Sequence, residues 1–177
     1  MRQTYIINTW DGPYYFPNQA TEHVFIGAFD NRYVSYFLDA LNEPILFEEP
    51  IKDTPIIRFS IFYAFSGPRI FRLEANDHGA NLLRIETTTT LGGWGPIEAN
   101  NRTDLALNDE EYDAILTLVN AVRPCHAPAA ERLGFDGYTW FLEVKTQDQY
   151  CAISRWVPEP GPWQDLAAAL EELAAAQ

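Results

Sequence analysis

The sequence predicts an α+β fold, in which a mainly antiparallel sheet of β-hairpins carries two or three helices packed on one face. Three observations lead to this class. Segments rich in β-branched and aromatic residues are separated by short turn sequences. Other segments repeat their apolar residues at helical spacing. The segments follow in the order strands, helix, hairpin, helix, and the 177 residues fit a single domain.

The first part of the chain is dense in aromatic residues and interrupted by prolines. Residues 4–10 and 22–29 are expected to form strands, each followed by turn-forming residues. Residues 31–41 favour a helix, because their aromatic and apolar side chains follow helical spacing. Residues 41–55 contain three prolines and are expected to form mostly loop.

The middle of the chain is predicted to be strand. Residues 55–65 are too apolar, and too rich in β-branched and aromatic side chains, for a surface helix. Residues 69–75 and 80–90 read as a hairpin, because a four-residue turn ending in glycine separates them. The glycine-rich stretch GGWGP at 92–96 is expected to be a turn that leads into a short strand at 102–107.

Two helices are expected in the last third. Residues 108–122 begin with Asn108 as N-cap and Glu111 three residues later, which is a capping box. Acidic residues in this first turn complement the positive end of the helix dipole. Residues 163–176 are rich in alanine, a strong helix former.

Between these helices, residues 138–157 predict a second hairpin with a two-residue turn. That turn places Trp140 opposite Arg155, where a cation–π contact would form. The same register puts Glu143 and Arg155 on opposite faces, and a one-residue bulge would bring them together. Glu143 is expected to make a structural ion pair or to bond Tyr150, with a general acid of raised pKa as the alternative.

The second part of the chain, residues 69–177, carries a recognisable pattern, DGxxWxxE…Y…SRWxPExGP. With it the chain resembles a group of small, uncharacterised bacterial proteins that share two hairpins, a glycine-aromatic loop and an acid-capped helix. The resemblance covers about residues 69–173 and implies a fold that forms as a unit, and it implies no activity. The matching residues are Gly92-Gly93-Trp94, Arg102-Thr103, Asn108, Asp136-Gly137, Trp140, Glu143, Tyr150, Arg155-Trp156, Pro158-Glu159 and Gly161-Pro162.

The net charge of −13 argues against binding to nucleic acid or to an anionic membrane, because both need a basic face. The same charge would speed the encounter with a basic partner. The two cysteines, Cys125 and Cys151, are expected to be free buried thiols. The first residues lack the features of a signal peptide, and no stretch is long and apolar enough to span a membrane. The expected location is the cytoplasm.

Motifs for catalysis or for cofactors are absent from the sequence. The three histidines lie far apart and lack metal-ligand spacing, so neither a metal nor a cofactor is expected. The GGWGP stretch does not fit a phosphate site, because no helix follows its glycines. Trp94 either pins this loop to the core or is exposed as an aromatic anchor for a partner.

Three functions follow as hypotheses. The first is an acidic binding protein, in its most concrete form an immunity protein that blocks a bacterial toxin, with an unknown oligomeric state. The second is a small enzyme with a site around Glu143 and Arg155. The third is a structural or assembly protein. For the first, aromatic anchors and acids are the expected contacts. The candidate contacts are Trp10, Tyr14, Tyr15, Trp94, Asp109, Glu110 and Asp113.

Overall fold

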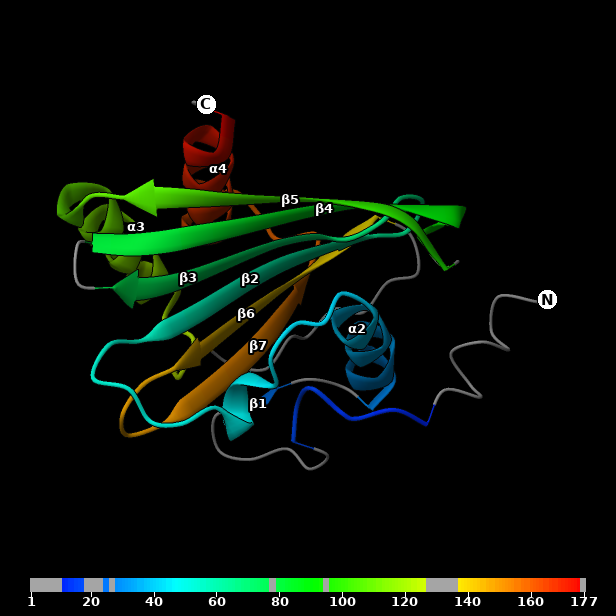
Figure 1. Cartoon of the computed structure of the whole chain (residues 1–177), viewed down its shortest axis with the longest axis horizontal. Coiled ribbons are helices and arrows are strands. Elements are labelled where there is room, and N and C mark those ends of the chain that lie inside the picture. Colours follow the sequence, from blue (N-terminus) through cyan, green and yellow to red (C-terminus); the bar gives the residue numbers. More distant parts are fainter. Residues whose placement is uncertain are drawn as a thin grey trace.

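The computed structural model describes residues 11–17, 24–25, 28–76, 79–93, 96–126 and 137–175. In this part of the chain a long twisted sheet of seven strands and three α-helices confirm the α+β class (Figure 1). The strands are β1 (Val24–Phe25), β2 (Ile56–Tyr63), β3 (Arg69–Asn76), β4 (Gly79–Gly93), β5 (Ile97–Leu107), β6 (Tyr138–Lys145) and β7 (Tyr150–Trp156). The helices are α2 (Ala28–Ala40), α3 (Asp109–Val122) and α4 (Pro162–Ala175), with a short 3-10 turn η1 (Leu46–Glu48).

The strand order across the sheet is β1-β7-β6-β2-β3-β4-β5. Strands β2 to β5 follow one another as antiparallel neighbours, and the β6–β7 hairpin joins them beside β2. Strand β1 runs parallel to β7 and covers only part of the strand predicted at 22–29. The strand predicted at 4–10 lies outside the described residues.

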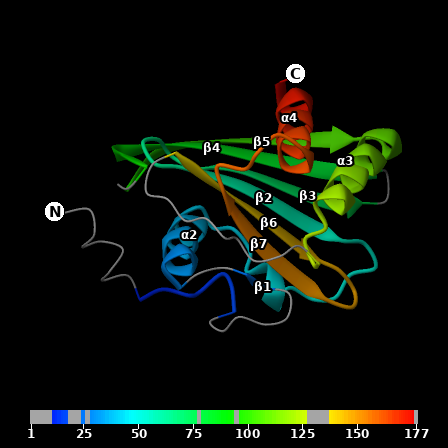
Figure 2. The same cartoon turned by 180° about the vertical axis from the view of Figure 1, so that it is seen from behind.

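The helices lie on both faces of the sheet, so the expectation of one covered face is wrong. Helix α2 crosses one face, and α3 and α4 cross the other, which Figure 2 shows from behind. The reason lies in β2, whose side chains are buried on both sides along nearly its whole length. A strand that is apolar on both sides must be covered on both faces to keep water out.

Helices α3 and α4 pack on a core built from the odd-numbered positions of β2 and β3, such as Phe59 and Phe71. Helix α3 buries Ile115, Val119 and Val122 on this face. The predicted capping box is confirmed: the Asn108 side chain accepts from the Glu111 backbone, and the Glu111 side chain accepts from the Asn108 backbone. The cap fixes where the helix begins, directly after β5.

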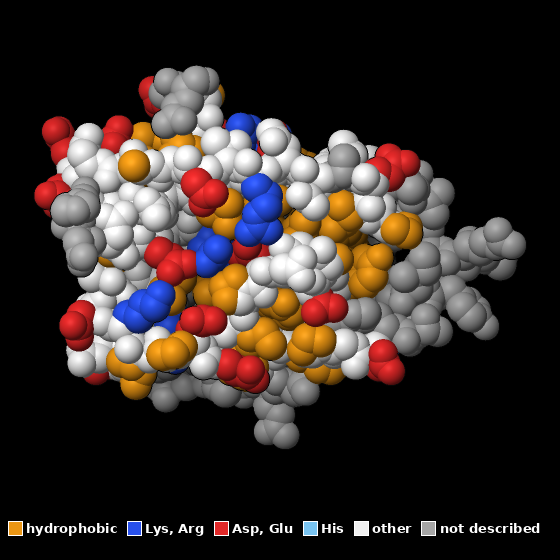
Figure 3. Space-filling view, in the orientation of Figure 1, with side chains coloured by type: hydrophobic (Ala, Val, Ile, Leu, Met, Phe, Trp, Pro, Cys, Tyr) orange, Lys and Arg blue, Asp and Glu red, His pale blue; other side chains and the backbone are white. Residues whose placement is uncertain are grey.

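Helix α2 packs on a second core on the opposite face. Its residues Tyr33, Val34, Phe37 and Leu38 lie with Phe62, Phe141, Ile70 and Ile85 in one buried cluster. The helix begins at Ala28, before the predicted start, so Asp30 and Asn31 lie inside it rather than ending a strand. Figure 3 shows this face, where hydrophobic side chains gather on one half and a line of alternating basic and acidic side chains crosses the other.

The β4–β5 hairpin is longer than predicted. Strand β4 continues through Gly93 and β5 begins at Ile97, so residues expected to be loop pair across the two strands as far as Thr89 and Ile97. The run of threonines at 87–90 explains the extension, because β-branched residues favour strands. Gly67, in the turn between β2 and β3, lies so close to Thr87 of β4 that a Cβ at this position would collide with it. Trp94 itself lies outside the described residues.

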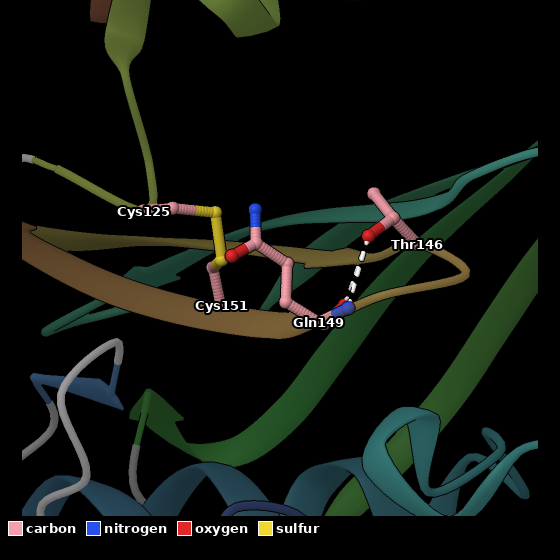
Figure 4. The surroundings of a disulfide bond; sticks show 4 residues. All are labelled: Cys125, Thr146, Gln149 and Cys151. Atoms are coloured by element: carbon pink, nitrogen blue, oxygen red, sulfur yellow. Dashed lines mark hydrogen bonds between the residues drawn. A yellow bond between two sulfur atoms is a disulfide. The ribbon is translucent and has the colours of Figure 1, made fainter.

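Cys125 and Cys151 form a disulfide, so the expectation of two free thiols is wrong (Figure 4). Helix α3 ends at Arg123, which adopts a left-handed conformation with φ of 57° and turns the chain. This turn brings Cys125 beside β7, with 5.2 Å between the two Cα atoms. That separation suits a disulfide. The bond ties the end of α3 to the sheet, over a separation of 26 residues.

Candidate functional site

The most highly charged group of buried residues lies on the α2 face of the sheet and centres on Arg58. Strand pairing places Arg58 of β2 directly between Arg72 of β3 and Glu143 of β6. The Arg58 guanidinium donates to both carboxylate oxygens of Glu143, at 2.6 Å from Nε and 2.7 Å from Nη2. Tyr150 of β7 donates its hydroxyl to the same carboxylate at 2.8 Å. Glu143 is thus held from the two strands that flank β6, and its predicted bond to Tyr150 is confirmed.

A second carboxylate, Glu43, completes the group from the loop after α2. Its side chain is fully buried and lies 3.1 Å from Arg72, 3.3 Å from Arg102 and 3.7 Å from Arg58. Tyr15 fixes this loop by donating its hydroxyl to the Glu43 carbonyl at 2.8 Å. We call Glu43, Arg58, Arg72, Arg102 and Glu143 the ionic cluster.

Backbone carbonyls accept two further hydrogen bonds from the ionic cluster. Arg58 donates to the Pro44 carbonyl at 2.8 Å, and Arg102 donates to the Leu41 carbonyl at 2.8 Å. A buried charge is tolerated only when it is paired and its hydrogen bonds are made. The cluster therefore joins the loop after α2 to β2, β3, β5 and β6.

Burial and ion pairing act against each other in this cluster. It raises the pKa of Glu143 above its ordinary value, against the opposing charge and hydrogen bonds of Arg58. Burial works to lower the pKa of Arg58, but the Glu143 carboxylate outweighs it, with help from Glu43, and this pKa is raised. Burial also raises the pKa of Tyr150 well above its usual range. Glu43, Arg58 and Glu143 are mutually dependent charges shielded from water, whereas Arg72 and Arg102 are partly exposed.

Glu143 and Arg155 do not meet, so the structure does not bring together the two residues named in the enzyme hypothesis. Strands β6 and β7 pair without a bulge, with Trp140 opposite Arg155 as predicted. Glu143 faces the ionic cluster, whereas the Arg155 guanidinium lies over the Trp163 ring of α4 on the other face, 5.9 Å from its centre. The predicted cation–π partner of Arg155 was Trp140, which instead stands next to Trp163 in the same aromatic cluster.

The candidate partner-binding residues fall into three groups. Asp109, Glu110 and Asp113 are exposed on α3. Tyr15 is only 4% exposed and is bonded into the core, so its prediction as a surface anchor is wrong. Tyr14 is half-buried. The remaining candidates, Trp10 and Trp94, lie outside the described residues.

On the α3–α4 face, two arginines are also paired internally. Arg69 contacts Glu86 at 2.9 Å and also Glu171 of α4. Arg84 contacts the same two acids, at 2.7 Å and 3.5 Å. These pairs fasten α4 to the sheet. In the described part of the chain, most arginines are thereby committed to partners within the molecule.

The described residues contain no group of three or more His, Cys, Asp or Glu side chains placed to hold a metal ion. None of the helices in this part of the chain is long and apolar enough to cross a membrane. The chain matched no model of a known protein family and no curated protein. The resemblance drawn from the C-terminal pattern therefore stays a prediction.

The sequence reasoning missed the partners of Glu143. A signal was present in the segment IIRFSIF, where Arg58 interrupts an otherwise apolar strand. An arginine at such a position is almost never buried without a paired charge. Glu43 gave no comparable signal, because it lies in a proline-containing loop where an acid is expected to be solvated.

Proposed function

We propose that this chain is a non-enzymatic acidic binding protein, and most concretely an immunity protein that neutralises a basic bacterial toxin by direct contact. The observation that supports this function most strongly is the exposed, unpaired acidic surface at the start of α3. Asp109, Glu110 and Asp113 are exposed there. Among the described residues, no ion pair reaches these three carboxylates.

The support under this surface is rigid. Helix α3 buries its apolar side in the core, starts at a complete capping box, and is fastened near its end by the Cys125–Cys151 disulfide. A surface held in this way loses little conformational freedom when a partner binds. The acids also have a structural role, since they complement the helix dipole. Both roles are compatible, because the carboxylates point outward.

The internal ion pairs strengthen the argument. Five arginines, at positions 58, 69, 72, 84 and 102, contact acids within the molecule. Their positive charge is therefore largely neutralised before any partner arrives. The net charge of −13 is then presented by acids that have no such partner, and a field of this sign steers basic proteins toward the surface.

The compartment is a separate question. The sequence favours the cytoplasm, yet a disulfide such as Cys125–Cys151 is typical of oxidising compartments and rare in the cytosol. We propose that the Cys125–Cys151 disulfide forms in the same compartment in which the protein acts. Thiol labelling of the protein in intact cells tests this: blocked cysteines support an oxidising compartment, and free thiols support the cytoplasm.

Co-purification tests the proposed function. The tagged chain is co-expressed with each protein encoded by its neighbouring genes, and bound proteins are identified after washing in low salt. We expect one basic partner, held with nanomolar affinity that weakens as salt rises, and loss of that partner's toxicity when both are expressed together. Failure to form a complex with any neighbour-encoded protein would contradict the proposal.

A further inference from the structure

Strand β5 forms an open edge of the sheet. Among the described residues it pairs only with β4, and Figures 1 and 2 show it as the outermost strand along its whole length. It has 11 residues, about twice the length of an ordinary strand. It contains no proline, and the one irregularity in its pairing with β4 lies at Glu98, so residues 99–107 form a regular stretch that can pair further. An edge of this kind is a template for another strand.

Two opposite charges stand on this edge, on either side of Thr103. Arg102 and Asp104 pair across the ladder with Ile85 and Leu83 of β4, so both side chains stand on the α2 face. Arg102 reaches inward to Glu43, but 38% of its side chain is exposed. Asp104 is exposed and has no hydrogen bond or ion pair among the described residues.

We infer that β5 pairs with β5 of a second copy of this chain, antiparallel, around a two-fold axis at Thr103. The axis must stand perpendicular to the sheet, because only then do two identical neighbouring strands run antiparallel. Such an axis keeps each face of the sheet continuous, so every residue lies opposite one from the same face of its strand. The axis therefore passes through a residue position, and only a few registers remain.

Charge selects one of these registers. With the axis at Thr103, each Arg102 lies opposite the other copy's Asp104, and the two Thr103 side chains face each other. Opposite charges and threonine pairs in directly facing positions both stabilise a sheet. An axis at Arg102 would oppose two arginines, and an axis at Asp104 would oppose two aspartates.

Three further registers are inferior. An axis at Asn100 would also place Glu98 opposite Arg102, but its ladder would be limited to 97–103 and would include the irregularity at Glu98. An axis at Asn101 would place Glu98 opposite Asp104 twice, which brings like charges together. An axis at Leu105 would shorten the shared ladder to 103–107, place Asp104 opposite Ala106 and leave Arg102 outside the ladder. The charge pattern of β5 is therefore complementary to itself in the register centred on Thr103. This self-complementarity favours a second copy of β5 over an unrelated strand.

Helix α4 lies on the other face of the sheet, and charge affects the strength of the dimer. In Figures 1 and 2 it projects past β5 on the side of the sheet opposite α2. The net charge of −13 on each copy opposes association. The dimer is therefore expected to form only at higher protein concentrations. It should be measured at physiological salt, where the Debye length is about 8 Å and the repulsion is largely screened.

Cysteine cross-linking tests the register directly. In the Thr103→Cys variant the two new cysteines would face each other, with Cα atoms about 4.5–5.5 Å apart, which suits a disulfide. Both native cysteines are already paired, so no other thiol competes. The matched control is Asn101→Cys on the same face, whose two copies would lie about 13 Å apart along the strands. Mild oxidation should link the first variant into a covalent dimer and leave the second monomeric.

Sedimentation equilibrium of the unlinked chain tests the charge argument. Asp104→Arg should weaken dimerisation about tenfold or more, because two attractive facing pairs become repulsive. Asp53→Arg, an equal charge change in an exposed loop, should not weaken it. A chain that stays monomeric at all concentrations would overturn the inference, as would equal cross-linking of the two cysteine variants. A dimer unaffected by Asp104→Arg would also overturn it, since the copies would then meet elsewhere.

Discussion

Arg58 and Glu143 face each other across β2 and β6 and form a two-point ion pair at 2.6 Å and 2.7 Å, with both side chains almost completely buried. The two residues lie 85 positions apart in the chain. Their ion pair joins the β6–β7 hairpin, near the end of the chain, to β2 at the centre of the sheet. Removing either partner would leave an uncompensated charge inside the protein.

We expect Arg58→Met to lower the free energy of unfolding by about 3–5 kcal/mol, because Glu143 would lose its counter-charge. The double variant Arg58→Met with Glu143→Leu should be less destabilised than the sum of the two single variants. Urea unfolding of the four proteins measures this coupling. Arg69→Met, in a half-exposed ion pair, is the control and should cost about 1 kcal/mol or less. Simple additivity of the Arg58 and Glu143 changes would contradict the account.

The same variant should change the pH dependence of stability. Burial already raises the pKa of Glu143, and loss of Arg58 removes the largest opposing effect, so this pKa should rise further. A carboxyl whose pKa is higher in the folded than in the unfolded state stabilises the fold below its unfolded value. That contribution is lost as pH rises through the folded pKa. Stability of Arg58→Met should therefore decline from mildly acidic to neutral pH more steeply than that of the parent, in urea unfolding at several pH values.

Buried tyrosines predict sensitivity to alkali. Burial is the main reason that the pKa of Tyr15 is raised from 10.0 to about 12, and it raises the pKa values of Tyr33 and Tyr150 as well. Above pH 10 the unfolded chain loses these protons while the folded chain keeps them, so their contribution to stability falls as pH rises. Tyrosinate absorbance and far-ultraviolet circular dichroism should show the last phenols ionising together with unfolding. Complete ionisation of an intact fold would contradict this.

The disulfide should contribute measurably to stability. Closing a loop over a separation of 26 residues corresponds to about 3–4 kcal/mol in the chain-entropy estimate. The double variant Cys125→Ala with Cys151→Ala should have a lower urea midpoint of unfolding than the parent protein. Reductant should lower the midpoint of the parent by a similar amount. The double variant should be indifferent to reductant, which makes it the control. No effect of reductant on the parent would mean that the bond does not stabilise the fold.

Local patterns predicted much of the fold. The capping box at Asn108 and Glu111 located the start of α3, because its signal lies within four consecutive residues. The register of Trp140 opposite Arg155 followed from a two-residue turn. The length of β4 was underestimated, because the glycines at 92–93 indicate a turn, whereas the strand continues through Gly93.

The ionic cluster and the disulfide were not predictable in the same way. Arg58 meets Glu143 only because β6 inserts next to β2, and this strand order is a property of the whole sheet. Glu43 becomes buried because the loop after α2 turns back over β3 and β5. Cys125 meets Cys151 because Arg123 ends α3 in a left-handed conformation that carries no strong sequence signal. Such contacts depend on packing between segments that are remote in the chain.

The association rate with the basic partner isolated by co-purification tests the central claim most directly. The variant Asp109→Asn with Glu110→Gln and Asp113→Asn removes three exposed charges from α3. Its control, Glu48→Gln with Asp53→Asn and Asp148→Asn, removes three exposed charges elsewhere. We predict that the α3 variant associates about tenfold more slowly at low salt and that the control changes little. Equal slowing of both variants, or of neither, would contradict binding through α3.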